Sequence, residues 1–288
     1  MNRSKIIISL TTIPSRIDDI EPVLNSLLNQ TVKPDKVYIN VPKKYNRFKE
    51  VIEEPSFIKE KFSDKVELFY IDQDYGPATK FIGSLFNKQI KKEDLLIITD
   101  DDVVKTKTWL KMLLDNHLDN RVTSFVERNL GTEIIWGYLG YIFKRKLFNL
   151  SEILEFFNKV KSECYLVDDH WFTGFCHYKK IMIYNIPINI NEINNLFVHG
   201  GSKESLVNIG GYNNRGPVSD RCRRIIKKNY NTEFPFWCCL GCCKFGKPID
   251  FSNKNNKIES FINLSSKSRI KNYLFIFSVI LIMVKYFR

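Results

Sequence analysis

Three consecutive aspartates, Asp100, Asp101 and Asp102, follow the apolar run 95–99 directly. That run has the composition of a buried strand, and ligands of open α/β sheets bind beyond the carboxyl ends of the strands. Three adjacent carboxylates repel one another unless partners balance their charge. A divalent ion that bridges carboxylate and diphosphate oxygens would do so, because such ions prefer oxygen ligands. Since side chains alternate along an extended chain, we expect Asp100 and Asp102 to point together and Asp101 to point elsewhere.

The alternative for this acidic run is a solvated turn or a helix N-cap, because Asp is common at both. Three aspartates directly behind a strongly apolar strand favour the metal and diphosphate interpretation.

A second acidic pair, Asp168 and Asp169, stands ahead of Trp171 and Phe172. A carboxylate in a ligand site can act as a general base that takes the proton from an attacking hydroxyl group. The alternative is that the pair caps the helix that begins there. Residue type alone favours capping, so the order of the motifs along the chain has to decide between the two.

A further segment with possible chemistry spans residues 74–80, behind the third apolar run. Its Gly76 and Pro77 predict a tight turn that lets the backbone approach a ligand. Lys80 stands at the start of a predicted helix. It can meet a phosphate there, or it is an ordinary solvated lysine.

The elements that must position these residues alternate along the chain. Buried strands are predicted at residues 5–10, 36–41, 66–71 and 95–99. Helices are predicted at residues 22–28, 79–86 and 109–117. Strands that alternate with helices predict βαβ units and a largely parallel sheet.

The pattern changes after Gly131. A helix is predicted at 150–160 and a strand at 181–190, and the chain is loop-rich from Asn191. Residues 134–143 are aromatic and apolar. They can form an aromatic wall against which a sugar stacks, or a strand of the core.

These segments together resemble the GT-A glycosyltransferases, especially the family-2-like ones. Residues 6–16 look like their first strand and nucleotide loop, and residues 74–80 look like a second nucleotide segment. Residues 100–102 are similar to their Asp-x-Asp motif. Residues 167–171 look like the later acidic motif at the head of an acceptor-side helix. The motifs come in the family's order and roughly its spacing, over residues 5 to about 215.

The resemblance implies a GT-A fold, which is a Rossmann-like, mostly parallel sheet flanked by helices. It implies transfer from a UDP- or GDP-sugar donor to a hydroxyl group of a glycan, protein or lipid acceptor. Asp100 and Asp102 would hold Mn²⁺ or Mg²⁺, and His199 would be a third ligand, although a lone His is more often structural. Asp169 would be the base of an inverting transfer, with Asp168 as the second candidate.

The resemblance also implies a set of residues that contact the nucleotide-sugar donor. They are Thr11, Thr12, Pro14, Arg16, Asp74, Lys80, Asp100, Asp101 and Lys203. For Arg16 the alternative is an ion pair on the surface with Asp18 or Asp19.

Two other functions remain open. Asp100 and Asp102 behind an apolar strand also resemble the nucleophile motif of haloacid-dehalogenase-like phosphatases, in which the first Asp attacks phosphate. That interpretation leaves the segments 11–14 and 76–77 unexplained. The non-enzymatic alternative is a basic, membrane-tethered binding protein.

Composition restricts the partners. The 288 residues are 44% hydrophobic, which allows a sizeable core, and the net charge is +12. Such a charge favours anionic partners. No tight basic-aromatic stripe is present, so we expect a nucleotide donor or anionic lipid rather than nucleic acid.

The seven cysteines do not form the even, spread framework of a small secreted protein, which favours a reducing compartment. Four of them crowd into residues 238–243. Their spacing fits structural zinc poorly, and S-palmitoylation or a plain buried cluster is expected there.

The two ends of the chain differ. The first apolar run is too short for a signal peptide. Residues 273–284 are apolar but short for a full crossing, which predicts a membrane-associating tail, with a final core helix as the alternative. We expect a glycosyltransferase domain over 1–235, a Cys-rich segment and polar linker over 236–271, and a hydrophobic tail over 272–288, with the domain facing the cytosol.

Overall fold

The computed structural model describes residues 3–62, 64–127, 134–198, 206 and 215–232. The predicted linker and tail, 236–271 and 272–288, lie outside the described residues. Within the described part of the chain, no helix is long and apolar enough to cross a membrane.

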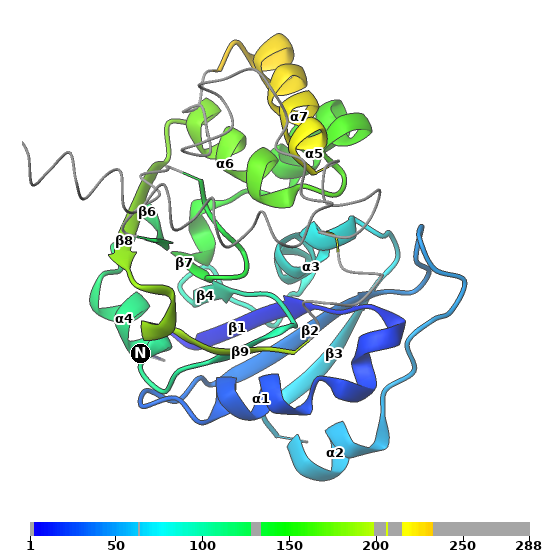
Figure 1. Cartoon of the computed structure of the whole chain (residues 1–288), viewed down its shortest axis with the longest axis vertical. Helices are drawn as coiled ribbons and strands as arrows, with labels where there is room; N and C mark the ends of the chain where they lie inside the picture. The colour runs from blue at the N-terminus through cyan, green and yellow to red at the C-terminus, as the bar shows by residue number, and fades with distance from the viewer. Residues whose placement is uncertain (1–2, 63, 128–133, 199–205, 207–214, 233–288) are drawn as a thin grey trace, which may run out of the picture. The chain divides into compact units, whose positions relative to one another are not determined.

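The core of the fold is a seven-stranded sheet in the order β3-β2-β1-β4-β7-β6-β8 (Figure 1). Its strands are β1 (Ile6–Thr11), β2 (Lys36–Pro42), β3 (Val66–Ile71), β4 (Leu95–Ile98), β6 (Arg121–Glu127), β7 (Tyr141–Lys144) and β8 (Met182–Ile188). Only β7 runs antiparallel to its two neighbours, β4 and β6, and the other pairs are parallel. The predicted α/β fold with a mostly parallel sheet is confirmed.

Helices cover both faces of the sheet, and two apolar cores result. One face carries α3 (Thr79–Phe86), α5 (Leu150–Cys164), α6 (Asp168–Tyr178) and α7 (Arg215–Tyr230). The other carries α1 (Glu21–Leu28), α2 (Ser56–Phe62) and α4 (Trp109–Asp115). In β4, Leu96 and Ile98 join the first core and Ile97 joins the second. This alternation explains why the strand sequences are continuously apolar.

The strand order creates a switch point between β1 and β4. The chain runs outward from β1 through β2 to β3, then returns to the other side of β1 as β4. Ligands of doubly wound sheets bind where the strand order reverses, at the carboxyl ends of the strands. The segment 99–102 leaves β4 at this place.

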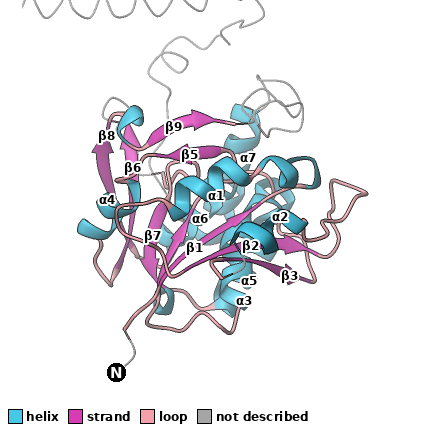
Figure 2. Cartoon of the chain, turned by 90° about the horizontal axis from the view of Figure 1, so that it is seen from below, coloured by secondary structure: helices cyan, strands magenta, loops and turns pink. Residues whose placement is uncertain are grey.

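Several elements were not predicted from the sequence, among them α2 and β6. β5 (Val103–Lys105) and β9 (Asn194–Phe197) form a separate antiparallel pair (Figure 2). α7 lies in the part that was expected to be loop-rich. It escaped prediction because its apolar stripe is sparse: among many charged residues, Cys222 and Ile226 are the buried members.

A disulfide that the sequence did not suggest joins Cys164 of α5 to Cys222 of α7. It crosses 58 residues and ties α7 to the helical layer over the sheet.

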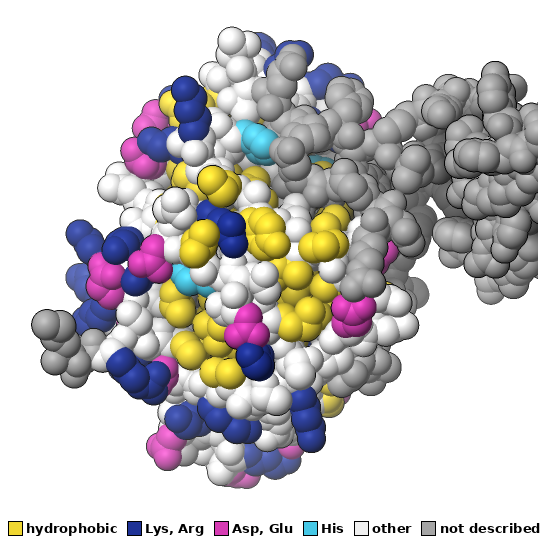
Figure 3. Space-filling model, turned by 90° about the vertical axis from the view of Figure 1, so that its left-hand side faces the viewer, with side chains coloured by type: hydrophobic (Ala, Val, Ile, Leu, Met, Phe, Trp, Pro, Cys, Tyr) yellow, Lys and Arg dark blue, Asp and Glu magenta, His cyan; other side chains and the backbone are white. Residues whose placement is uncertain are grey.

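The strand β8 forms one edge of the sheet, and hydrophobic side chains gather on the face shown in Figure 3. Met182 and Tyr184 are the exposed large hydrophobic residues of β8. The guanidinium of Arg121 lies 4.2 Å from the centre of the Tyr184 ring, so part of this edge is covered by a cation–π contact.

Candidate active site

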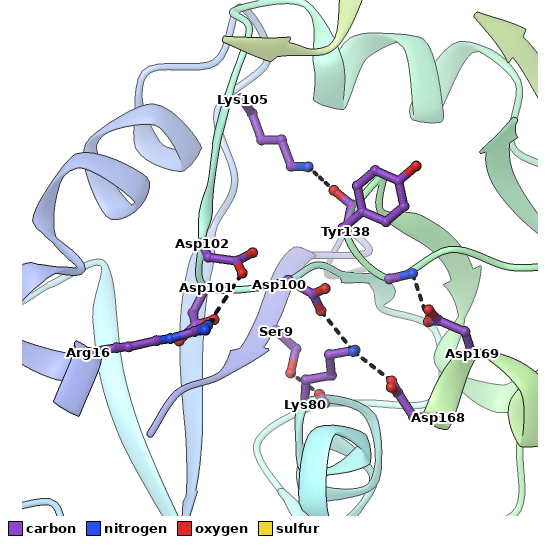
Figure 4. A network of polar contacts seen from close by, with 11 residues as sticks. Ser9, Arg16, Lys80, Asp100, Asp101, Asp102, Lys105, Tyr138, Asp168 and Asp169 are labelled. Atoms are coloured by element: carbon purple, nitrogen blue, oxygen red, sulfur yellow. Dashed lines mark hydrogen bonds and ion pairs between the residues drawn. The ribbon is translucent and has the colours of Figure 1, made fainter. Parts of the chain in front are cut away.

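The acidic run lies at the switch point, where residues 99–102 link β4 to β5 (Figure 4). The loop after β1, the start of α3 and the start of α6 also reach this place. We call Asp100, Asp101, Asp102, Asp168 and Asp169 the carboxylate cluster.

Asp101 points toward the loop after β1. Its Oδ2 accepts a hydrogen bond from the Thr12 hydroxyl at 2.6 Å, and its Oδ1 lies 3.1 Å from Arg16 Nη1. The same Arg16 nitrogen lies 3.3 Å from Asp102 Oδ2. Arg16 is buried, so the alternative of a surface pair with Asp18 or Asp19 is not what the structure has. Arg16 instead fastens the loop after β1 to the acidic run.

Lys80 is buried at the centre of the cluster, with 2% of its surface exposed. Its Nζ lies 2.8 Å from Asp100 Oδ1 and 2.6 Å from Asp168 Oδ2. The alternative of a solvated lysine is therefore wrong. Burial alone would lower the pKa of this ammonium group, but the surrounding carboxylates, Asp100 first, outweigh it and hold the pKa well above its usual value.

The backbone of Lys80 is also fixed. Its carbonyl oxygen accepts a hydrogen bond from the Ser9 hydroxyl at 2.6 Å, and Ser9 in turn accepts one from the Asn40 amide at 2.7 Å. Strands β1 and β2 therefore set the start of α3.

Asp168 and Asp169 lie in the first turn of α6, where the helix dipole favours negative charge. The N-cap position belongs to Val167, so neither aspartate is the capping residue. Asp169 Oδ1 accepts a hydrogen bond from the Gly137 backbone N–H at 2.9 Å.

Gly137 brings the backbone against the cluster. A Cβ atom at this position would lie 2.8 Å from Lys80 Nζ, and 3.1 Å from both Asp100 Oδ1 and Asp169 Oδ1. A side chain here would force these groups apart, so the close approach requires glycine. The sequence signal was only a glycine beside aromatic residues.

Lys105 is a site residue that the sequence analysis missed. Its buried Nζ donates hydrogen bonds to the Tyr138 carbonyl oxygen and, at 3.0 Å, to Asn194 Oδ1. Burial lowers the pKa of Lys105 to about 7, against the raising effect of Asp100 and Asp102. The available signal was its position three residues behind the acidic run.

Carboxylates outnumber cationic side chains among the described residues of the cluster. Burial, together with the charges of Asp100 and Asp101, raises the pKa of Asp102 to about 7. Burial also raises the pKa of Asp101, against the lowering effect of Arg16. Among the described residues, the five aspartates of the cluster face three cationic side chains: Arg16, Lys80 and Lys105. Asp100 and Asp102 offer carboxylate oxygens, the ligands that a divalent ion such as Mg²⁺ prefers, so the residues fit such an ion.

The described residues do not by themselves make a complete metal cage. In the ranges that the structure describes, no group of three or more His, Cys, Asp or Glu side chains has a ligand arrangement. Mg²⁺ commonly binds through one or two carboxylates, with water and substrate phosphates as further ligands, and Asp100 and Asp102 suit that mode. The predicted His199 and Lys203 lie outside the described residues.

The other predicted donor contacts line the same edge of the sheet. The Thr11 hydroxyl donates to the Asn40 carbonyl oxygen at 2.7 Å, and Pro14 opens a short 3₁₀ helix. Asp74 accepts backbone N–H bonds from Asn46 and Gly76, both at 2.7 Å. Asp74 thus holds the turn before α3, apart from the carboxylate cluster.

No protein-family model matches the chain, and no curated protein does. Among solved structures, the chain is similar to the mannosyltransferase PcManGT from Pyrobaculum calidifontis in complex with GDP-Man and Mn²⁺. That match has 18% identity and a TM-score of 0.47, and it covers 65% of this chain and 56% of that one.

It is also similar to TarS residues 1–349 from S. aureus in complex with UDP-GlcNAc, at 14% identity and a TM-score of 0.46, with 81% of this chain and 68% of that one covered. A 4-diphosphocytidyl-2C-methyl-D-erythritol synthase from Anaerococcus prevotii gives 12% identity and a TM-score of 0.46, with 72% and 96% covered. These likenesses concern the fold, and the site itself carries the argument for function.

The lowered pKa of Lys105 predicts a specific pH dependence of stability. From about pH 7 to pH 10.5 the unfolded chain holds the lysine proton and the folded chain does not, so stability rises with pH in this window. Lys105→Met lacks this contribution. We expect the free energy of unfolding of the wild type, relative to Lys105→Met, to increase between pH 7 and pH 10 and to be level below pH 6.

Urea unfolding in EDTA from pH 5 to pH 10 measures this difference. Lys111→Met, at an exposed pair with Asp115, is the matched control and should follow the wild-type profile. Parallel profiles for the wild type and Lys105→Met would contradict the prediction.

Proposed function

We propose that this chain is a metal-dependent glycosyltransferase that moves a sugar from a nucleoside-diphosphate sugar to an acceptor hydroxyl group. One observation carries the proposal: at the switch point of the sheet, three consecutive aspartates stand at the carboxyl end of the buried strand β4, with the buried Arg16 and Lys80 against them. A second acidic pair stands on the other side of the same Lys80. The donor would bind beside Asp100–Asp102, and the acceptor would bind beside Asp168 and Asp169.

Asp100 and Asp102 would hold Mn²⁺ or Mg²⁺ together with the donor diphosphate. The bound ion would act as a Lewis acid that neutralises the departing diphosphate. Arg16 supports the arrangement, because its contacts at 3.1 and 3.3 Å orient Asp101 and Asp102 before any ligand arrives. His199 as a third ligand and Lys203 as a diphosphate contact belong to the same proposal.

The nucleotide would lie along the carboxyl ends of β1 to β3. Thr11, Thr12 and Pro14 belong to the strand end and loop that border this edge, and Asp74 holds the turn that closes it. A UDP- or GDP-sugar is the proposed donor.

Asp169 would act as the general base of an inverting transfer. Lys80 Nζ lies 2.6 Å from Asp168 Oδ2, and this ion pair commits Asp168 to holding the ammonium group. Asp169 Oδ1 accepts the Gly137 N–H at 2.9 Å, which orients this carboxylate for the role of general base.

The acceptor would be a glycan, protein or lipid that meets the aromatic residues beside Gly137. The Trp136 ring lies 6.1 Å from the Tyr138 ring and 6.5 Å from the His170 ring, measured between centroids. Aromatic surfaces of this kind present apolar faces to sugar rings.

Residues 272–288 are proposed to associate with a membrane, and the catalytic domain to face the cytosol. The Cys164–Cys222 disulfide argues against the second point and against the reducing compartment expected from the cysteine pattern, because disulfides are rare in the cytosol.

Nucleotide binding tests the proposed activity. We expect UDP or GDP to raise the melting temperature of the chain only when Mn²⁺ is present, because a ligand that binds the folded state stabilises it. At 100 times its Kd the gain is about 2.7 kcal/mol. Asp102→Asn should abolish the rise, and Asp115→Asn, an exposed residue of α4, should leave it unchanged.

The same scan separates the alternatives. Turnover of a phosphomonoester without any nucleotide response would favour the phosphatase. No response of either kind would favour the binding protein.

The base assignment is tested by Asp169→Asn. We expect nucleotide release from the donor to slow by about 10²–10⁴-fold, because general base catalysis contributes on that order. The nucleotide-dependent rise in melting temperature should persist. If Asp168→Asn slowed the reaction and Asp169→Asn did not, the two roles would have to be exchanged.

A further inference from the structure

The position of the Lys80 ammonium suggests a role beyond binding a ligand. It comes from α3, and the carboxylates around it come from two other segments, the link after β4 and the first turn of α6 (Figure 4). Lys80 has 2% of its surface exposed, and its ammonium nitrogen lies within 2.8 Å of two carboxylates. Its positive charge balances the carboxylates of Asp100 and Asp168 inside the protein.

Two carboxylates contact the Lys80 ammonium group, and a third lies near it. Asp100 Oδ1 and Asp168 Oδ2 lie within 2.8 Å of the ammonium nitrogen. A Cβ atom placed on Gly137 would lie 2.8 Å from this nitrogen and 3.1 Å from Asp169 Oδ1. An inward cluster of carboxylate oxygens from separate elements is what a divalent ion such as Mg²⁺ takes as ligands. Here an ammonium group with three N–H donors takes that place.

Asp100 stands between the Lys80 ammonium group and the proposed metal position. Its Oδ1 contacts Lys80, and Figure 4 shows Asp102 on its other side. In sites that bind two metal ions, the ions lie about 3.5–4 Å apart. A carboxylate in the position of Asp100 would serve both ions of such a pair.

We propose that Lys80 occupies the position of a second cation and thereby limits the site to a single divalent ion. The inference rests on the proposed metal-dependent function, which supplies the first ion at Asp100 and Asp102. Lys80 contributes one positive charge where a second ion would contribute two. It also aligns Asp100 and Asp168 whether or not the first ion is bound, because Ser9 fixes its backbone.

The test is the number of Mn²⁺ ions bound by the full-length chain. Equilibrium dialysis against Mn²⁺ followed by metal analysis is carried out on the wild type, Lys80→Met and the exposed control Lys111→Met. We expect Lys80→Met to bind about one more Mn²⁺ per chain than the wild type, since two-ion sites of this kind share carboxylates. Lys80→Met with Asp168→Asn should return to the wild-type number, because the second position then loses a ligand.

Equal numbers for the wild type and Lys80→Met would overturn the proposal. The number of Mn²⁺ ions bound by the wild type tests the metal-dependent function separately. If the wild type binds no Mn²⁺ even with UDP or GDP present, that result counts against the function. The comparison between the variants stays valid in that case. If Lys80→Met is unfolded without metal, circular dichroism replaces dialysis. Refolding on addition of Mn²⁺ supports the proposal, and a variant that stays unfolded in Mn²⁺ contradicts it, because the ion then fails to replace the ammonium group.

Discussion

The ion pairs of Lys80 with Asp100 and Asp168 hold three parts of the molecule in register. Lys80 lies in the first turn of α3, Asp100 follows the last residue of the central strand β4 by two positions, and Asp168 begins α6. Removing one partner of a buried ion pair typically costs about 3–5 kcal/mol, since the remaining charge stays buried without compensation. The donor side and the acceptor side of the proposed site therefore depend on a single ammonium group for their spacing.

The sheet brings this group to the place where it acts. β4 is buried on both faces, so its side chains are committed to the two cores as far as Ile98, and the polar residues begin where the strand ends. β1 ends beside it, and its loop supplies Thr12 and Arg16 to the outer side of the acidic run. The strand order thus brings the aspartates together with Arg16 and Lys80 at the carboxyl ends of β1 and β4.

Much of this fold could be predicted from sequence because strands buried on both faces are continuously apolar. The predicted strand 66–71 matches β3, and 95–99 exceeds β4 by one residue. Elements with weak patterns were not predicted: β5 and β9 are short, and α7 is rich in charged residues. The position of the acidic run directly after a buried strand could be predicted, but the residues that its neighbours contact could not. Lys80 was expected to contact a phosphate or solvent. Arg16 was expected to contact the donor or to form an ion pair with Asp18 or Asp19. The residues that Lys80 binds lie far away in sequence, so no local pattern shows them.

The central claim is that the acidic run at the end of β4 holds one divalent ion and the donor diphosphate. Crystals grown with Mn²⁺ and the nucleotide that stabilises the chain would test it directly through anomalous scattering from manganese. The account predicts one manganese peak between the carboxylates of Asp100 and Asp102, with the diphosphate bound to it and Lys80 still between Asp100 and Asp168. A peak elsewhere, or a nucleotide bound away from the carboxyl ends of β1 and β4, would contradict it.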